Sequence, residues 1–169
     1  MKKTLTILSV VLLAAGGLFA QSTKNLTMTV NLSAWYDLSL SAASISFTDV
    51  APTAAAAPAT VSIAANEGAV SVRAFAVTGA GKTLSLTVKA NGDLVSGSDS
   101  IGIGAISWAS TGSGYVNGAM ATSNVTAGSW SGSILHWHEG SFTYSFLRDY
   151  TAQAPGTYTA SATYTLSAV

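Results

Sequence analysis

The sequence predicts an all-β protein, an antiparallel immunoglobulin-like β-sandwich of about eight to ten strands. Apolar and polar residues alternate along residues 26–40 and again along residues 158–168. The segments between them are short apolar runs separated by Gly, Asn and Pro, without the periodicity of an amphipathic helix. A period of two places every second side chain on the same face of a strand, so each alternating segment has one apolar and one polar face.

Residues 1–20 have the form of a bacterial secretory signal peptide. Lys2 and Lys3 precede an apolar run that ends at Phe19, and Ala20 is a small residue at the expected cleavage point. The run is short and rich in small residues, which does not favour a membrane span, and no later segment is apolar enough to be one. We therefore expect export to the periplasm, the cell surface or the medium, with residues 21–169 forming a single domain.

The first alternating segment has two parts. Its apolar face includes Leu26, Met28, Val30, Leu32, Ala34, Tyr36, Leu38 and Leu40, and Trp35 lies on the polar face. We expect residues 34–40 to be a strand of the domain itself. Residues 21–32 are either an N-terminal extension that is donated to another chain, or a segment that completes the chain's own first strand.

Further strands are expected in order along the chain. Apolar alternation and turn residues predict strands at residues 43–50, 60–65, 69–78 and 83–90, with a loop at residues 51–60 and turns at residues 79–81 and 91–93. Ile101 and Ile103 are at odd positions whereas Ile106 and Trp108 are at even ones, which predicts a β-bulge near Gly104. After a loop at residues 111–114, shorter strands are expected at residues 115–122, 125–131, 135–137 and 141–147, and a turn at residues 153–156 leads into the last strand.

The charge and cysteine content excludes several classes of function. The chain has seven basic and seven acidic residues, and removal of Lys2 and Lys3 leaves it slightly acidic. Nucleic acids and anionic membrane surfaces require a basic face, so neither is an expected partner. The chain has no cysteine, so its stability has to come from burial, backbone hydrogen bonds or assembly with other chains.

No catalytic or cofactor-binding constellation stands out. His136 and His138 would share one face of a strand, but the chain has no other histidine and no cysteine, and a metal site generally needs three or four ligands. We therefore expect neither a metal nor another cofactor, and these two histidines are the only metal candidates. No serine has the pattern of a nucleophile with its base and acid, and we expect the protein not to be an enzyme.

Tryptophans offer an alternative function. Trp35 and Trp130 are candidates for stacking on sugar rings if they are exposed, which would make the protein a secreted carbohydrate-binding module. Tryptophans more often lie in a core or an interface, so this interpretation depends on their exposure.

The two ends of the expected domain resemble a known plan. Residues 24–30 (KNLTMTV) are similar to the N-terminal segment of cysteine-free fimbrial major subunits of the chaperone–usher type. The ending APGTY at residues 154–158, continued by alternating residues to Val169, is similar to their last strand, and also to the ends of spore-coat-U-like secreted proteins and WxL surface domains.

The resemblance implies a structural protein of the cell surface, with a role in cell adhesion. Such subunits have an incomplete sandwich with an open groove, which the N-terminal segment of the next subunit fills as a donated strand. The residues donated here would be Leu26, Met28, Val30 and Leu32, whose burial is worth roughly 6–10 kcal/mol before ordering costs. The partners implied are further copies of the chain, other surface proteins and a periplasmic chaperone.

Overall fold

The computed structural model describes residues 24–51, 58–79, 81–131 and 136–169. The expected signal peptide, residues 1–20, lies outside the described residues, as does most of the loop expected at residues 51–60. The chain divides into residues 1–31 and a compact unit, Leu32–Val169, which contains all of the strands.

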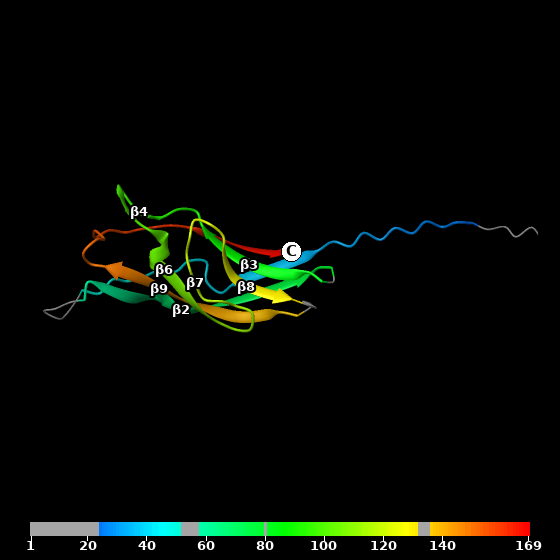
Figure 1. The fold of residues 1–169 in the computed structure, drawn as a ribbon, viewed down its shortest axis with the longest axis horizontal. Coiled ribbons are helices and arrows are strands. Elements are labelled where there is room, and N and C mark those ends of the chain that lie inside the picture. The colour runs from blue at the N-terminus through cyan, green and yellow to red at the C-terminus, as the bar shows by residue number, and fades with distance from the viewer. Residues whose placement is uncertain (1–23, 52–57, 80, 132–135) are drawn as a thin grey trace, which may run out of the picture. The chain divides into compact units, whose positions relative to one another are not determined.

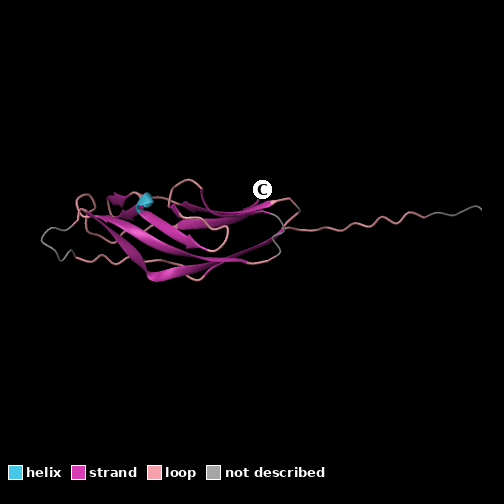
Figure 2. Ribbon diagram, turned by 60° about the horizontal axis from the view of Figure 1, so that its bottom comes forward, coloured by secondary structure: helices cyan, strands magenta, loops and turns pink. Residues whose placement is uncertain are grey.

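The expected all-β antiparallel sandwich is confirmed. The described residues form ten strands and one short 3₁₀ turn, and no α-helix is present among them (Figure 2). The elements are β1 (Trp35–Leu40), β2 (Thr60–Val77), β3 (Thr83–Ala90), β4 (Leu94–Ser96), β5 (Asp99–Ile101), η1 (Ile103–Ala105), β6 (Ile106–Thr111), β7 (Gly118–Ala119), β8 (Val125–Ser131), β9 (His138–Asp149) and β10 (Ala162–Ala168).

Two antiparallel sheets face one another across the core (Figure 1). The larger sheet has the order β1-β2-β9-β6-β7, the smaller has the order β10-β3-β8, and β4 and β5 pair as a separate hairpin. Every second residue is buried along β3 and along β2 from Val70 to Ala76, as the alternation in their sequences requires. The largest fully buried side chains are Phe142, Leu84, Leu86, Val70, Val72 and Val88.

The last strand is confirmed from Ala162 onwards, whereas residues 158–161 of the alternating segment lie outside it. β10 pairs with β3 from Ala162 opposite Ala90 to Ala168 opposite Leu84. Its even-numbered residues face the core, and the hydroxyls of Tyr144 in β9 and Tyr164 in β10 are 2.6 Å apart, which links the two sheets by a hydrogen bond. Burial raises the pKa of both phenols, so the hydroxyls stay protonated and able to donate.

The first alternating segment is a strand only in its second half. β1 begins at Trp35 and pairs with β2, whereas residues 24–34 form no strand. A strand forms only where a neighbouring strand satisfies its backbone groups, and alternation alone does not supply that neighbour.

The strand expected at residues 43–50 is wrong, because this segment is extended but makes no regular ladder. It lies against β2, where the amide of Asn66 donates to the carbonyl of Ser46 at 2.9 Å. The strands expected at residues 60–65 and 69–78 are a single strand, β2, whose register shifts between Ala64 and Ala69. Gly68 supplies the positive φ of +67° within this irregularity.

Three further expectations in the middle of the chain need correction. The register change near Gly104 occurs, but the 3₁₀ turn η1 produces it instead of a β-bulge, and this turn allows Ile103 and Ile106 both to be buried. The strand expected at residues 115–122 shortens to the two residues of β7. Leu135 lies outside the described residues, and Trp137 precedes β9 instead of belonging to a strand.

Candidate functional site: an open groove between the sheets

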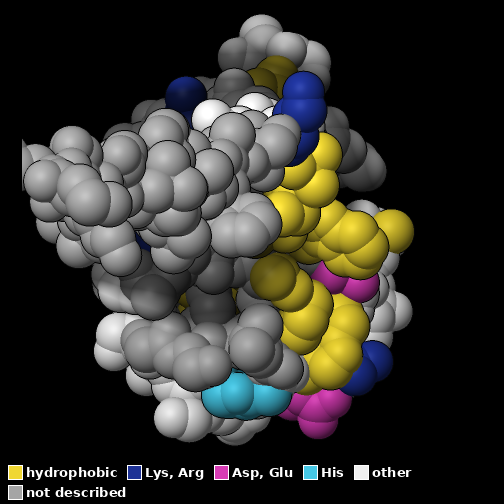
Figure 3. All heavy atoms as spheres, turned by 90° about the vertical axis from the view of Figure 1, so that its right-hand side faces the viewer, with side chains coloured by type: hydrophobic (Ala, Val, Ile, Leu, Met, Phe, Trp, Pro, Cys, Tyr) yellow, Lys and Arg dark blue, Asp and Glu magenta, His cyan; other side chains and the backbone are white. Residues whose placement is uncertain are grey.

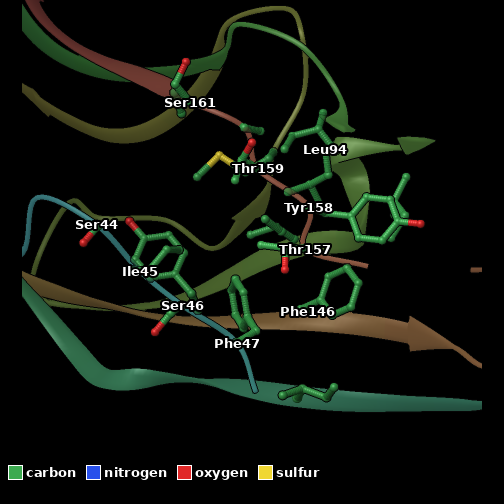
Figure 4. Close-up of a pocket in the computed structure, with 18 of the residues that line it drawn as sticks. Ser44, Ile45, Ser46, Phe47, Leu94, Phe146, Thr157, Tyr158, Thr159 and Ser161 are labelled. Carbon is green, nitrogen blue, oxygen red and sulfur yellow. The ribbon is translucent and has the colours of Figure 1, made fainter. Parts of the chain in front are cut away.

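A groove of about 1070 Å³ opens along one side of the sandwich. It runs between the segment that follows β1, residues 41–47, and the segment that precedes β10, residues 154–162. Figure 4 shows Ile45 and Phe47 pointing from the first segment into this space, with Phe146 beside them, while Ser44 and Ser46 point away. The volume is close to the upper limit of the range for small-molecule sites.

The groove is lined mainly by apolar side chains. Its floor consists of buried core residues, namely Val70, Leu94, Ile101, Ile103, Ile106, Met120 and Tyr144. Its rim consists of hydrophobic residues that are only partly buried, namely Leu38, Leu40, Ala42, Ile45, Phe47, Phe146, Tyr158 and Tyr164. The groove therefore exposes the partly buried hydrophobic residues of its rim, while the core residues of its floor have little exposed surface.

Hydrogen bonds hold the first wall of the groove against β2. The Glu67 carboxylate accepts from the Ser46 amide at 2.8 Å and from the Ser46 hydroxyl at 2.7 Å, and the Asn66 side chain donates to the Ser46 hydroxyl at 3.0 Å. The hydrogen bond from the Ser46 amide, and to a lesser extent the one from the Ser46 hydroxyl, holds the pKa of Glu67 below its ordinary value. These bonds explain how residues 44–48 stay in place without a regular ladder.

The second wall bonds away from the groove. The Val95 and Thr159 backbones exchange hydrogen bonds at 3.0 and 3.1 Å, and the Asn91 amide donates to the Ser161 carbonyl at 2.9 Å. β1 and β10 are the edge strands of their sheets on this side. An edge strand presents backbone N–H and C=O groups to any further strand that comes to lie beside it.

A buried arginine is among the residues that line the groove. Arg148 is 9% exposed, and its Nε donates to Asp49 Oδ2 at 3.1 Å while its Nη1 donates to the Gln153 carbonyl at 2.7 Å. The Tyr150 hydroxyl also donates to Asp49, at 3.1 Å. These contacts fix the chain beyond Phe47 and satisfy the guanidinium, which leaves the rest of the groove apolar.

The strand-donation candidates are all exposed. Leu26, Met28, Val30 and Leu32 have 79%, 80%, 77% and 91% of their surface accessible. The first three belong to residues 1–31, and Leu32 begins the compact unit. A regular row of exposed large apolar side chains is unusual for a surface that faces only water and typically marks an interaction site.

The two sugar-stacking candidates have different environments. Trp35 is 70% exposed, whereas Trp130 is 7% exposed and its indole donates to the Ser113 carbonyl at 2.7 Å. Trp130 also packs edge to face on Tyr115, with ring centroids 4.8 Å apart. Trp130 is therefore a core residue on the buried face of β8, and its ring is not accessible to a sugar.

The two histidines do lie together, with ring centroids 4.5 Å apart, and His138 stacks on Trp130 at 4.7 Å. Burial, followed by the charge of His136, lowers the pKa of His138, so its imidazole is neutral near pH 7. Within the described part of the chain, no group of three or more His, Cys, Asp or Glu side chains is placed to hold a metal.

The Tyr115 hydroxyl donates to the His138 carbonyl at 2.6 Å, and burial raises the pKa of Tyr115 to about 12.

Ile45, Phe47 and Tyr158 lie at apolar positions of alternating segments, but the sequence has no feature that predicts a groove beside them.

Among the described residues, no helix is long and apolar enough to cross a lipid bilayer. Comparisons of the chain with protein-family models, with curated proteins and with solved structures found no match.

Proposed function

We propose that this chain is a subunit of an extracellular polymer that assembles by β-strand donation, in which residues 24–32 of one copy occupy the groove of the next. One observation carries the proposal: the same chain has a row of exposed apolar side chains and an apolar groove with no cover. Each would be costly to leave in water, and each supplies what the other lacks.

The chemistry of the two surfaces is complementary. A strand laid beside β10 would pair with its free backbone edge, and every second side chain would point at the groove floor. Leu26, Met28, Val30 and Leu32 have this spacing, and Thr27, Thr29 and Asn31 would face water. Burial of four such apolar side chains is worth roughly 6–10 kcal/mol before the cost of ordering the segment.

A second copy is a better donor than the chain's own segment. Insertion into its own groove would require residues 24–32 to turn back sharply just before β1 begins at Trp35. Tight two-residue hairpins need positive φ values, and residues 31–36 contain no glycine and no residue with positive φ. Donation between copies needs no reversal, and a head-to-tail contact that does not close generates a filament.

The proposal gives the protein a structural role at the cell surface after export, with no catalytic step. A newly exported subunit would carry an apolar groove before it meets its neighbour. Such a surface is an aggregation hazard, so we include in the proposal a chaperone that covers the groove until assembly.

The test compares two substitutions at adjacent positions of the donated segment, made in protein that starts at Gln21. Val30→Asp places a charge on the face that enters the groove, and Thr29→Asp places the same charge on the face that remains in water. Light scattering and electron microscopy are expected to show polymers for the parent protein and Thr29→Asp, and monomers for Val30→Asp.

A peptide experiment provides a second readout that does not depend on assembly kinetics. A synthetic peptide of residues 24–34 is titrated into the Val30→Asp protein, which is expected to bind it and to gain thermal stability. The same peptide carrying Val30→Asp is expected not to bind. Equal assembly of both variants, or absence of peptide binding, would overturn the proposal.

A further inference from the structure

A second, shallower hollow lies on the outer face of the larger sheet, where β1 begins and β2 ends. It has a volume of about 420 Å³ and is lined by Trp35, Tyr36, Asp37, Phe75 and Trp137. None of these residues lines the groove described above, so this hollow requires a separate explanation.

Strand register brings its aromatic residues together. Asp37 pairs with Phe75 and Trp35 pairs with Val77, so Trp35 and Phe75 are diagonal neighbours on the face of the sheet that points away from the core. Ala74 pairs with His138, which places Trp137 beside Phe75, and the two rings have centroids 5.1 Å apart. No local pattern in the sequence relates Phe75 to Trp137, because the two residues come together only through the pairing of β2 with β9.

The rings in this hollow are accessible. Trp35 is 70% exposed and Trp137 is 38% exposed. Figure 3, which looks at one end of the molecule, shows hydrophobic side chains gathered at that end, with acidic, basic and histidine side chains beside them. The indoles of Trp35 and Trp137 lie on either side of the Phe75 ring, and together they give the hollow an aromatic lining.

Charged side chains at the rim supply both hydrogen-bond donors and acceptors. Arg73 Nε donates to Glu139 Oε1 at 2.9 Å, and the Arg73 guanidinium lies 4.5 Å from the centre of the Trp137 ring. Asp37 adds a carboxylate to the lining itself. Arginine has five N–H donors, so one ion pair leaves several free for a ligand.

We propose that this hollow binds a neutral saccharide, with a sugar ring stacked on the exposed face of Trp35, Trp137 forming the opposite side of the hollow, and the sugar hydroxyls bonded to Asp37, Arg73 and Glu139. A sugar ring combines an apolar face with hydroxyls that both donate and accept, which matches this mixture of groups. A small organic cation fits less well, because Arg73 already occupies the cation–π position over Trp137 and would repel a second positive charge.

The experiment titrates soluble oligosaccharides of glucose and of N-acetylglucosamine, and choline as the cationic alternative, into protein that starts at Gln21. Tryptophan fluorescence and calorimetry report binding. We expect one of the oligosaccharides to bind, and both Trp35→Ala and Trp137→Ala to weaken binding by about tenfold or more. Val116→Ala, which removes a 42%-exposed apolar side chain outside the hollow, is the matched control and should bind normally.

Two further variants separate the outcomes. Asp37→Asn keeps a polar side chain and should weaken saccharide binding only modestly, whereas a cation site would lose most of its affinity. Val30→Asp should bind saccharide as well as the parent, so failure of strand donation and failure of this proposal are distinguishable. Binding of choline instead of either oligosaccharide, or saccharide binding that survives both tryptophan substitutions, would overturn the proposal, as would the absence of any binding to both oligosaccharides.

Discussion

Two phenylalanines in β9 provide a direct test of whether the groove is open in the free subunit. Phe142 is 0% exposed, and its ring centroid lies 6.1 Å from that of Trp108 and 5.7 Å from that of Tyr115. Phe146 lies four residues further along β9 on the same face of the strand, is only partly buried, and lines the groove beside Phe47. The same substitution at these two positions therefore removes the same atoms from a sealed and from an open environment.

Phe142→Ala should lower the free energy of unfolding by about 3–5 kcal/mol, because it removes buried apolar surface and leaves a closed cavity. Phe146→Ala should cost roughly 1–2 kcal/mol, because part of its surface is already in water and no closed cavity forms. The difference is large compared with a total stability of about 5–15 kcal/mol. Leu147→Ala, at a 50%-exposed position on the opposite face of β9, is the control and should change stability by no more than about 0.5 kcal/mol.

The assay is urea unfolding of the monomeric Val30→Asp protein carrying each substitution, followed by circular dichroism. Addition of the peptide of residues 24–34 should then raise the cost of Phe146→Ala towards that of Phe142→Ala, since the peptide would seal the groove over it. Equal costs for the two substitutions without peptide would refute the reasoning, because they would mean that the groove is already closed in solution.

Three other predictions concern the surrounding fold. The Ser46 hydrogen bonds keep the pKa of Glu67 below its ordinary value of 4.5, so the stabilising effect of the Glu67 carboxylate is present above pH 4.5 and is lost as the pH falls through the lowered pKa. In a plot of urea midpoint against pH, Glu67→Gln should reduce the slope over this acidic range, and an unchanged slope would contradict this. Gly128→Ala should destabilise by about 1–3 kcal/mol, since the new Cβ would lie 2.5 Å from Trp130, whereas Gly102→Ala meets nothing within 4 Å and should be near neutral in thermal melts. Tyr144→Phe should cost about 1–3 kcal/mol by leaving the Tyr164 hydroxyl unpaired, and the double substitution with Tyr164→Phe should cost less than the sum of the two single ones in a double-mutant cycle.

The sequence predicted best where a strand is buried on one face and paired on both sides. β3 shows this, because Leu84, Leu86 and Val88 are all buried and the alternation follows the pleat from end to end. The last strand is an edge strand that pairs with β3 alone, and it begins four residues later than the alternation at Tyr158 suggested. In such elements one physical cause, burial of every second side chain, determines both the pattern and the structure.

Secondary structure was predicted poorly where a segment contacts residues that are distant from it in the sequence. The alternation of Leu26, Met28 and Val30 shows which face favours burial but not which surface covers it, so the sequence left open whether this segment is an extension or part of the first strand. In the structure it forms no strand. Ile45 and Phe47 have the alternation of a strand, yet their segment is held by Glu67, a side chain far along the sequence. Long-range contacts of this kind leave no local periodicity.

The candidate sites show the same division. Alternation singled out Leu26, Met28, Val30 and Leu32, which the structure shows to be exposed, and their need for a partner stays a prediction. The groove arises from two segments 107 or more residues apart that no local pattern relates. The tryptophans are another example: Trp35 and Trp130 were equivalent candidates from the sequence, and only the position of each strand in its sheet decides that one is exposed and the other buried.

Disulfide trapping between two differently substituted proteins tests the central claim most directly. The natural chain has no cysteine, so every disulfide must join introduced residues. One protein carries Val30→Cys and the other carries Phe47→Cys, so a heterodimeric disulfide can form only if the extension of one copy lies against the groove of another. Strand donation predicts rapid formation of this heterodimer on non-reducing gels, and much less with Asn31→Cys in place of Val30→Cys. Equal trapping by the two positions, or no heterodimer from either, would contradict it.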